Sequence, residues 1–549
     1  MIKRIIKILL ITFLILVLAI FYLSIFGIKT DKFNNQIKNK ISESNKKINL
    51  DLKNIKIILS PLDLKANIVT FDTNILFNNK KIELQSIKTK ISLLQLFKKK
   101  FSIDNLQISS KSIKAKNLVS FIRSINNDPK LFLLEMMIRD GDIELTLDLN
   151  FDKMGKVKNN FKINGVAKQL KIKTLNNYNV NNINFVFDIK NKKYKFLKIE
   201  TELNTIKLNF PSVTVVEKND SFFIDGKIIN KEKVIPFDKI KDLLVGYTDL
   251  NLKHLHLISK NNFSFEVSKK FKLSNLNISS EINLSKLTYK NNFKSIQKYF
   301  PEIEDLINLK DHEIKFNYNK DKTKITGSGK ILIEGNEDKI SYEITKKNTE
   351  KGFKLSNLNI SSEINLSKLT YKNNFKSIQK YFPEIEDLIN LKDHEIKFNY
   401  NKDKTKITGS GKILIEGNED KISYEITKKN NKYYFKKILE VKQDIFIDEL
   451  QYKKAKNKKA LIKIQGTVSK NKNLFVNEFS LIENNNSILL KNINLTNKLK
   501  ISEIELLEFN YKNYNKIYNK IYLKKNKRNY IIEGKSFDAS HIINDVMDS

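Results

Sequence analysis

The sequence predicts a mainly β protein with short helices, in which an N-terminal transmembrane helix precedes an elongated, curled antiparallel β-groove built from repeats. Three observations support this fold class. An apolar run fills positions 8–28, residues 271–348 recur unchanged at 353–430, and apolar residues alternate with Lys, Asn and Ser over much of the chain. Alternation with a period of two is typical of an antiparallel sheet that has one face in water.

The apolar run at 8–28, ILLITFLILVLAIFYLSIFGI, is long enough to cross a hydrocarbon core of roughly 30 Å as a helix. A cleaved signal peptide would have a shorter apolar region and a small-residue cleavage site. This run ends instead in Phe-Gly-Ile-Lys at 26–29, after three basic residues in the first seven. We therefore expect a single-pass inner-membrane anchor with a cytoplasmic N-terminus and the bulk of the chain in the periplasm.

The net charge of +39 is the excess of 100 basic over 61 acidic residues, and among the basic residues only Arg4, Arg123, Arg139 and Arg528 are arginine. The lysines are spread along the whole chain, whereas a nucleic-acid site would concentrate charge on one face and favour arginine. A solvated lysine face is the favoured interpretation, with attraction to anionic lipid headgroups as a secondary effect. Nucleic acid is not a predicted partner. The absence of cysteine excludes disulfides and thiolate zinc sites.

The exact copy of 78 residues lies at an offset of 82. A compact domain rarely accepts such an insertion, whereas an array in which each unit contacts only its neighbours is merely lengthened. We expect four antiparallel strands per copy, because an even number preserves the direction of every following strand, and roughly 25 strands in all. We also expect a helical segment over 293–309, broken at Pro301, on the same edge of the sheet in both copies.

Other helical signals are short. Phe33, Ile37 and Ile41 lie at four-residue spacing after the anchor, which predicts an amphipathic helix. A proline leads an apolar helical stretch and then an alternating strand at four places, which indicates a diverged repeat: Pro129, Pro236, Pro301 and Pro383. The predicted organisation is an anchor at 1–28, an N-terminal module at 29–125, a β-groove segment at 126–270, repeat copies at 271–352 and 353–430, and a C-terminal β segment at 431–549.

One phase of the alternating strands is apolar, and we expect it to line a lumen. A hydrophobic content of 40%, part of it in the anchor, is small for two sheets packed face to face. A single long twisted sheet curls, and a contiguous exposed apolar face indicates a ligand. On a membrane-anchored protein that ligand is expected to be lipid. The predicted lining residues are Leu276, Ile278, Ile282, Leu284, Ile314, Phe316, Tyr318, Ile325, Ile331, Ile333, Ile396, Phe398, Ile413 and Ile415.

Four passages resemble a known family. The stretch 48–61 (INLDLKNIKIILSP), and 91–97 (ISLLQLF) followed by 101–108 (FSIDNLQI), look like the start of AsmA-like proteins. The stretches 140–152 (DGDIELTLDLNFD) and 533–540 (EGKSFDAS) look like the YhdP branch. The resemblance is clearest over about 1–165, and it implies a periplasmic β-groove of the bridge-like lipid transfer kind that supplies phospholipid to the outer membrane. YhdP-like relatives are much longer, and this sequence stops after an apolar helical start at 542–547, which leaves open that it is a fragment.

Motifs for catalysis are weak. The stretch ITGSGKIL at 325–332 lacks the first glycine and the final Ser/Thr of a phosphate loop. In Asp311-His312-Glu313, copied at 393–395, neighbouring side chains point to opposite faces of a strand and cannot act on one bond. His254 and His256 share a face, but no third ligand follows at suitable spacing. We expect no enzyme activity, no cofactor, no metal and no catalytic residue.

Two functions remain open at this point. The first is a passive conduit that carries phospholipid between the inner and outer membranes, with acyl tails on the apolar phase. The second is a structural or assembly factor that holds an envelope or outer-membrane component at an exposed strand edge, as in the related TamB branch. Uniformly apolar inward positions favour the conduit, and interruption by packed bulky layers favours the scaffold.

Overall fold

The computed structural model describes residues 2–31, 34–35, 38–39, 47–78, 80–93, 103–152, 157–174, 179–203, 206–231, 234–235, 252–290, 297, 300–301, 304–348, 358–372, 388–415, 418–454, 458–469, 474–496, 501–540 and 543. The described residues are 72% strand and 13% helix, so the protein is mainly β, which confirms the expected class. Among the described residues, 29 strands form one long antiparallel sheet that is not closed.

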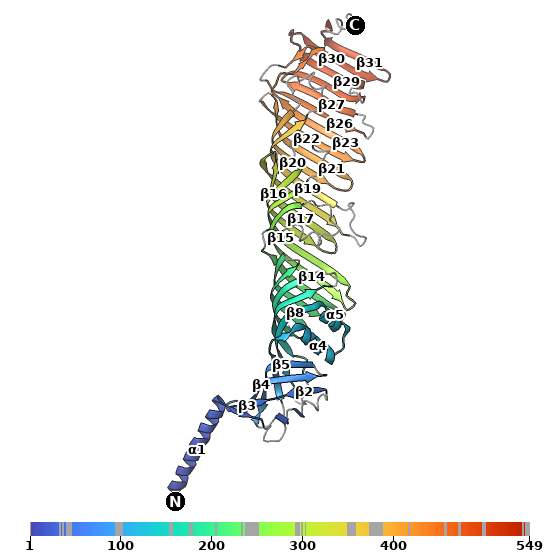
Figure 1. Cartoon of the computed structure of the whole chain (residues 1–549). Helices are drawn as coiled ribbons and strands as arrows, with labels where there is room; N and C mark the ends of the chain where they lie inside the picture. The colour runs from blue at the N-terminus through green and yellow to red at the C-terminus, as the bar shows by residue number, and fades with distance from the viewer. Residues whose placement is uncertain are drawn as a thin grey trace. The chain divides into compact units, whose positions relative to one another are not determined.

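The chain divides into two compact units: Met1–Glu232 with Ser259–Asn277, and Lys233–Ile258 with Ile278–Ser549. Strands β14 (Leu252–Ser268) and β15 (Leu273–Lys290) each contribute to both. The other described elements of the first unit are α1 (Ile2–Ile25), β1 (Ile28–Thr30), β2 (Ile48–Asp51), β3 (Asn54–Ser60), β4 (Lys65–Phe77), β5 (Lys80–Ser92), β6 (Ile103–Ser110), β7 (Ile113–Lys114), α4 (Ala115–Ile125), α5 (Pro129–Met137), β8 (Ile138–Asn150), β9 (Lys162–Lys173), β10 (Asn179–Lys190), β11 (Lys193–Leu203), β12 (Ile206–Glu217) and β13 (Ser221–Asn230) (Figure 1).

Helix α1 has a mean hydropathy of 3.0 in its most apolar window and no buried residue, so it is long and apolar enough to cross a membrane. It ends beside Gly27, whose φ is +63°. A Cβ there would lie 2.5 Å from the carbonyl oxygen of Ile57, so only glycine fits the turn into β1. β1 then pairs with β3. Residues 34–35 and 38–39 of the expected amphipathic helix are helical, while Phe33, Ile37 and Ile41 lie outside the described residues.

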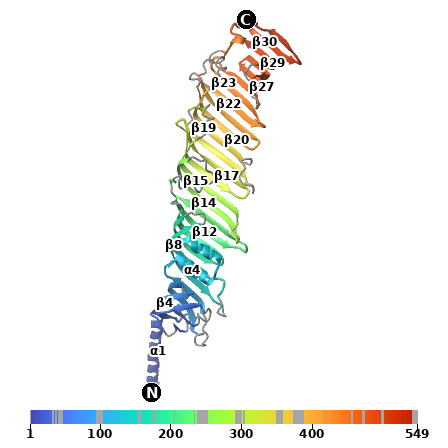
Figure 2. The ribbon, with the colours of Figure 1, turned by 45° about the vertical axis from the view of Figure 1, so that its right-hand side comes forward.

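Helix α4 covers the apolar face of the sheet in the first unit (Figure 2). Leu118 and Phe121 join a cluster with side chains of β2, β4 and β5, and Ala115 and Val119 join a second cluster with side chains of β8–β10. Helix α5 begins at the predicted Pro129, and the carboxylate of Asp128 accepts the backbone N–H of Lys130. Strand β8 follows directly, as the proline pattern predicts.

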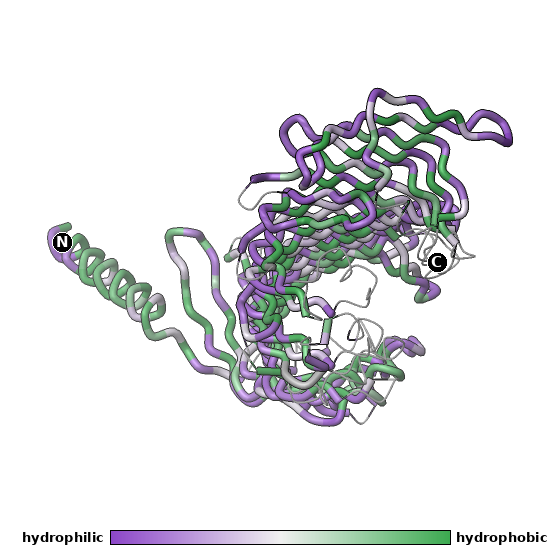
Figure 3. The backbone as a smooth tube through the Cα atoms, turned by 90° about the horizontal axis from the view of Figure 1, so that it is seen from above, coloured by the Kyte–Doolittle hydropathy of each residue, from purple (hydrophilic) through white to green (hydrophobic). Residues whose placement is uncertain are grey.

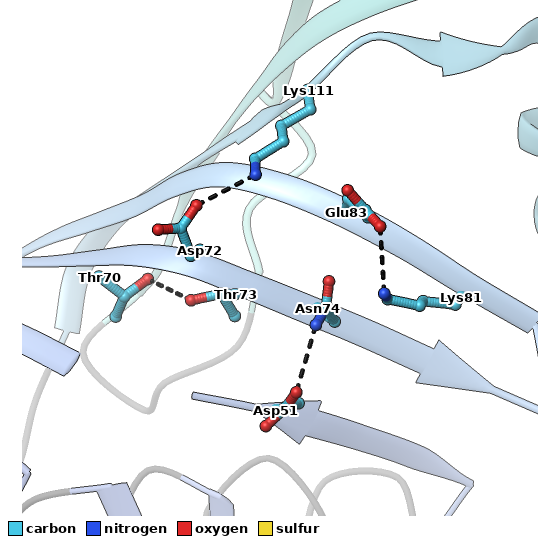
Figure 4. A network of polar contacts seen from close by, with 8 residues as sticks. All are labelled: Asp51, Thr70, Asp72, Thr73, Asn74, Lys81, Glu83 and Lys111. Atoms are coloured by element: carbon cyan, nitrogen blue, oxygen red, sulfur yellow. Dashed lines mark hydrogen bonds and ion pairs between the residues drawn. The ribbon is translucent and has the colours of Figure 1, made fainter. Parts of the chain in front are cut away.

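Short-range polar contacts lie on and beside β2, β4 and β5 in the first unit (Figure 4). The hydroxyl of Thr73 donates to that of Thr70 at 3.0 Å, and both side chains are buried. This pair satisfies groups that would otherwise be costly to bury. The surrounding contacts are exposed: Asn74 to Asp51 (3.2 Å), Lys111 to Asp72 (3.0 Å) and Lys81 to Glu83 (3.1 Å).

Both copies of the repeat lie in the second unit, apart from the start of copy 1 up to Asn277, and each has the predicted four antiparallel strands. Copy 1 supplies β15, β16 (Leu306–Tyr318), β17 (Lys322–Ile333) and β18 (Asn336–Lys347). Copy 2 supplies β19 (Leu358–Lys372), β20 (Leu388–Tyr400), β21 (Lys404–Ile415) and β22 (Asn418–Lys429). Equivalent residues pair in equivalent register: Ile282 opposes Ile314, and Ile364 opposes Ile396. Figure 2 shows these strands side by side.

The expected helix over 293–309 is wrong at its C-terminal end. Leu306 to Leu309 belong to β16 and pair with β15, as Leu306 opposite Lys290 shows. The apolar run after Pro301 has the composition of a short helix, but its backbone hydrogen bonds are made by the neighbouring strand. The predicted helical segment before Leu306, its copy and the stretch led by Pro236 lie largely outside the described residues, so their placement on one sheet edge stays a prediction.

The last part of the second unit has a sealed core. Its elements are β23 (Lys432–Val441), β24 (Phe446–Ile447), a 3-10 turn (Asp448–Leu450), β25 (Tyr452–Lys453), β26 (Ala460–Val468), β27 (Leu474–Glu483), β28 (Asn486–Leu495), β29 (Ile501–Lys512), β30 (Tyr518–Asn526) and β31 (Asn529–Ser536). The β24–β25 hairpin lies on the apolar face of the main sheet through Ile445 and Tyr452, both at most 1% exposed. The Tyr452 hydroxyl donates to Glu483 at 2.7 Å. The predicted apolar groove is therefore filled here by the chain itself.

Candidate functional site

The predicted lining residues lie on five strands and share one face of the sheet wherever a pairing relates them. Ile278 opposes Tyr318 and Ile282 opposes Ile314 between β15 and β16, while Phe316 opposes Ile325 between β16 and β17. Copy 2 repeats this arrangement with Phe398 on β20. Ile415 ends β21, but its side chain lies outside the described residues. Figure 3 shows the alternation of hydrophobic and hydrophilic residues along the strands.

This apolar face, which we call the open face, consists of the inward residues of β15–β22. Its side chains are mostly half-buried, and Leu284 and Ile413, at 4% and 8% exposure, are the buried members of the predicted set. The four hydrophobic clusters formed by described residues all lie elsewhere, at 48–145, 55–91, 115–199 and 439–537. The open face is therefore neither a sealed core nor a polar surface, although its role as a lumen stays a prediction.

The open face also carries His312 and Tyr342, which are absent from the predicted lining residues although they share the alternating phase of Ile314 and Ile340. His312 opposes Leu284 on β15, so it lies inward, and it is 1% exposed while Asp311 and Glu313 are exposed. This agrees with the expectation that the three neighbours cannot act together. The His312 Nε2 is 3.0 Å from the Lys330 carbonyl oxygen, and its Nδ1 is 3.5 Å from the Tyr342 hydroxyl. The inward positions are thus not uniformly aliphatic.

Copy 2 repeats this arrangement at His394, whose Nε2 is 2.9 Å from the Lys412 carbonyl oxygen. Burial lowers the pKa of His394 below its ordinary value of 6.5, against the opposing effects of the Lys412 carbonyl and Asp393. Burial therefore favours the neutral form of the His394 side chain in the folded state.

We expect the stability of the protein to fall as pH drops below 6.5. Because the pKa of His394 is lower in the folded state, the unfolded chain takes up a proton at this histidine first as the pH falls. The stability that depends on neutral His394 is therefore fully present above pH 6.5. It is lost as the pH falls from 6.5 to the folded-state pKa. Thermal unfolding at neutral and mildly acidic pH measures the effect. His394→Phe retains a ring and removes the titration, so it should flatten the pH dependence. An unchanged dependence in that variant would contradict the assignment.

The opposite face is polar and paired. Lys310 and Lys330 both contact the carboxylate of Glu337, at 2.6 and 3.0 Å, and their hydrogen bonds lower its pKa to about 2. Lys392 and Lys412 do the same to Glu419 in copy 2, at 2.6 and 2.7 Å. Exposed pairs of this kind contribute little to stability. These pairs place part of the protein's lysine on a solvated face of the sheet.

A hollow of about 730 Å³ lies over β15–β20, and most of its lining is polar. It shares Ile282 and Ile314 with the predicted lining residues, but Phe316, Ile325 and Ile331 do not contribute. The remainder consists of Glu281, Asn283, Glu313, Lys315, Thr326, Gly327, Ser328, Ser341, Tyr342, Glu343, Ser361, Ser362, Glu363, Lys397 and Asn399. This hollow is a different feature from the open face.

A carboxylate on β18 joins one copy to the next through the backbone. Asp338, 2% exposed, accepts the backbone N–H of Ser367 on β19 at 2.7 Å, and Glu334 accepts that of Thr370 at 2.8 Å. The equivalent Asp420 accepts the backbone N–H of Lys442, just after β23, at 2.9 Å. In the first junction the hydroxyls of Ser367 and Thr370 also donate to these carboxylates. The contact that both junctions share is a backbone N–H that donates to the aspartate, and the residue supplying it differs.

The described residues hold no group of three or more His, Asp or Glu side chains placed to bind a metal ion. His256 lies on β14 opposite Val234, and the side chain of His254 is outside the described residues. The GSG motif at 327–329 lies within β17 and is followed by strand, unlike a phosphate loop.

Comparison with known proteins found no matching family model, no similar curated protein and no similar solved structure.

Proposed function

We propose that this chain is an AsmA-like protein, anchored in the inner membrane by α1, whose open face carries phospholipid passively between the inner and outer membranes. The resemblance of the first 165 residues to that family motivates the family, and the open face motivates the cargo. The bulk of the chain then lies in the periplasm.

The observation that carries the proposal is the half-buried state of the open face over eight consecutive strands. Apolar side chains such as Ile314 and Phe316 remain part-exposed there, and the sealed clusters lie in other parts of the chain. Contiguous exposed apolar surface is unfavourable in water unless a ligand covers it. Acyl chains are apolar, flexible and able to adapt to a surface without fixed polar partners.

The tails and the headgroup of a phospholipid would lie at different parts of the sheet. Tails would lie along the open face, while headgroups would remain in water near the lysine-rich strand ends. Lys346 and Lys347 end β18, and Lys428 and Lys429 end β22. Such residues attract anionic headgroups by about 1 kcal/mol each near a surface.

Mass spectrometry of lipids that accompany the chain tests the proposal. Residues 29–549, secreted behind a cleavable signal and purified without detergent, should retain phospholipid because the open face needs an apolar occupant. A folded, soluble body that carries no lipid would contradict the proposal. The sealed segment at 439–537 supplies an internal comparison, because lipid-reactive probes placed on its apolar face should find no lipid.

One observation favours the second candidate, a TamB-like assembly factor. All eight residues of β31 are exposed, including Tyr530, Ile531 and Ile532, and the structure describes one pairing for this strand, with β30. An exposed edge can accept a further strand. If lipid is absent from the open face and a partner strand crosslinks to β31, the assembly function replaces the conduit.

A further inference from the structure

Several strand glycines in this protein lie beneath aromatic rings of the neighbouring strand. A Cβ added to Gly327 would lie 2.5 Å from the ring carbon Cζ and the hydroxyl oxygen of Tyr342, which is its cross-strand partner. In copy 2, a Cβ at Gly409 would lie 2.3 Å from Cζ of Tyr424. These separations are far below any real contact, so the rings occupy the space that a side chain would fill.

The same arrangement recurs in other parts of the chain. A Cβ at Gly226 would meet the ring of Phe263 at 2.5 Å in the first unit, and one at Gly329 would meet the ring of His312 at 2.4 Å in the second. Gly411 is covered in the same way by His394, whereas a Cβ at Gly165 or Gly466 would first meet a backbone carbonyl oxygen and then the ring of Phe187 or Phe435. Glycine in a strand interior is unfavourable relative to alanine, so its repeated use beneath a ring needs a structural cause.

We infer that Gly327 and Gly409 hold the rings of Tyr342 and Tyr424 flat against the open face and thereby keep the lipid path clear. A side chain on a strand normally stands roughly perpendicular to the sheet. A tyrosine standing in that way would project from the face that acyl chains must cross. Over a glycine, the ring folds across the neighbouring strand instead, and the apolar floor stays low. This inference rests on the proposed function, because clearance matters only if something moves along the face.

At these two positions glycine is needed to make room for the neighbouring ring, and not for its own backbone conformation. Gly327 and Gly409 lack the positive φ that would require glycine, so alanine fits their backbone. The three atoms nearest to a Cβ at Gly327 all belong to the end of the Tyr342 side chain, which can rotate away. A Cβ at Gly329 would instead approach the Cα of His312 at 2.8 Å, so that position is a poorer test.

The test is the double substitution Gly327→Ala with Gly409→Ala in the full chain, expressed in living cells. A photoreactive benzophenone amino acid replaces Phe398, which lies two strands from Tyr342 in the same cross-strand row. Mass spectrometry then measures phospholipid crosslinked to the protein. We expect the alanines to lower the crosslinked lipid roughly tenfold while the protein remains folded. Adding Tyr342→Ala and Tyr424→Ala should restore it, because the obstructing rings are then gone.

Three outcomes separate the inference from the proposed function. Equal crosslinking in the parent protein and the glycine variant overturns the inference and leaves the conduit standing. A loss that the tyrosine substitutions do not restore also overturns it, because the ring is then not the obstruction. A parent protein that crosslinks no phospholipid overturns the proposed function and the inference together. Resistance to proteolysis, measured on every variant, identifies any loss that comes from unfolding, and unfolding that the tyrosine substitutions leave uncorrected counts against the inference.

Discussion

Deletion of residues 349–430 should leave a folded protein that is shorter by four strands. The removed segment contains β19–β22, so the sheet of the second unit should shorten by about 19 Å at 4.7–4.9 Å per strand. The thermal midpoint should stay within about 5 °C, because no cluster of buried residues is cut. Small-angle scattering and thermal unfolding measure both quantities.

The reason is that both junctions have the same geometry. Lys339 pairs with Asn365 at the end of copy 1, and Lys421 pairs with Glu440 at the end of copy 2. After the deletion, Asp338 would therefore face the backbone N–H of Lys442, which Asp420 now holds. The sequence at the new junction is Lys-Lys-Asn-Asn-Lys, which is identical to that of the present turn at 428–432.

A matched control removes residues 388–429, which takes out three strands. An odd number reverses the direction of every following strand, so β23 could no longer pair in its native register. We expect this shorter deletion to aggregate. If the 82-residue deletion aggregates as well, the repeat is part of a closed core and the modular interpretation fails.

Phe316→Asp combined with Phe398→Asp should remove lipid from the protein without unfolding it. Both side chains are half-buried on the open face, so water can reach a new carboxylate and its burial cost stays well below that of an ion in a dry interior. Acyl chains cannot pack against a charge, and lipid occupancy should fall roughly tenfold or more. Lipid mass spectrometry and an envelope-integrity assay in cells measure the effect.

Ser328→Asp and Ser410→Asp supply the control on the polar face. Both serines are exposed on strands whose inward neighbours are glycines, so these charges enter water and should change neither folding nor lipid content. The conduit is wrong if the phenylalanine variants unfold the protein while the serine variants abolish lipid binding.

The fold class and the even number of strands per repeat could be predicted from the sequence, because alternation with a period of two and an identical repeated segment need no tertiary information. The helix at 306–309 could not be excluded in the same way, since only its pairing with β15 shows that it is strand. The β24–β25 hairpin that seals one end, and the glycines beneath Tyr342 and Tyr424, depend on cross-strand neighbours that are distant in sequence. A pattern read along one strand does not contain that information.

The main-chain junction at Asp338 and Asp420 also bears on inheritance. Because both junctions share an aspartate that accepts a backbone N–H from the following segment, we expect unequal recombination between the two identical segments to produce chains with one, two or three units whose junctions keep this contact. Selection could then adjust the reach of the protein in increments of four strands, about 19 Å each. Under the proposed function, a lineage whose envelope thickens or thins would have a mutational route to a matching length that keeps the existing contacts between units.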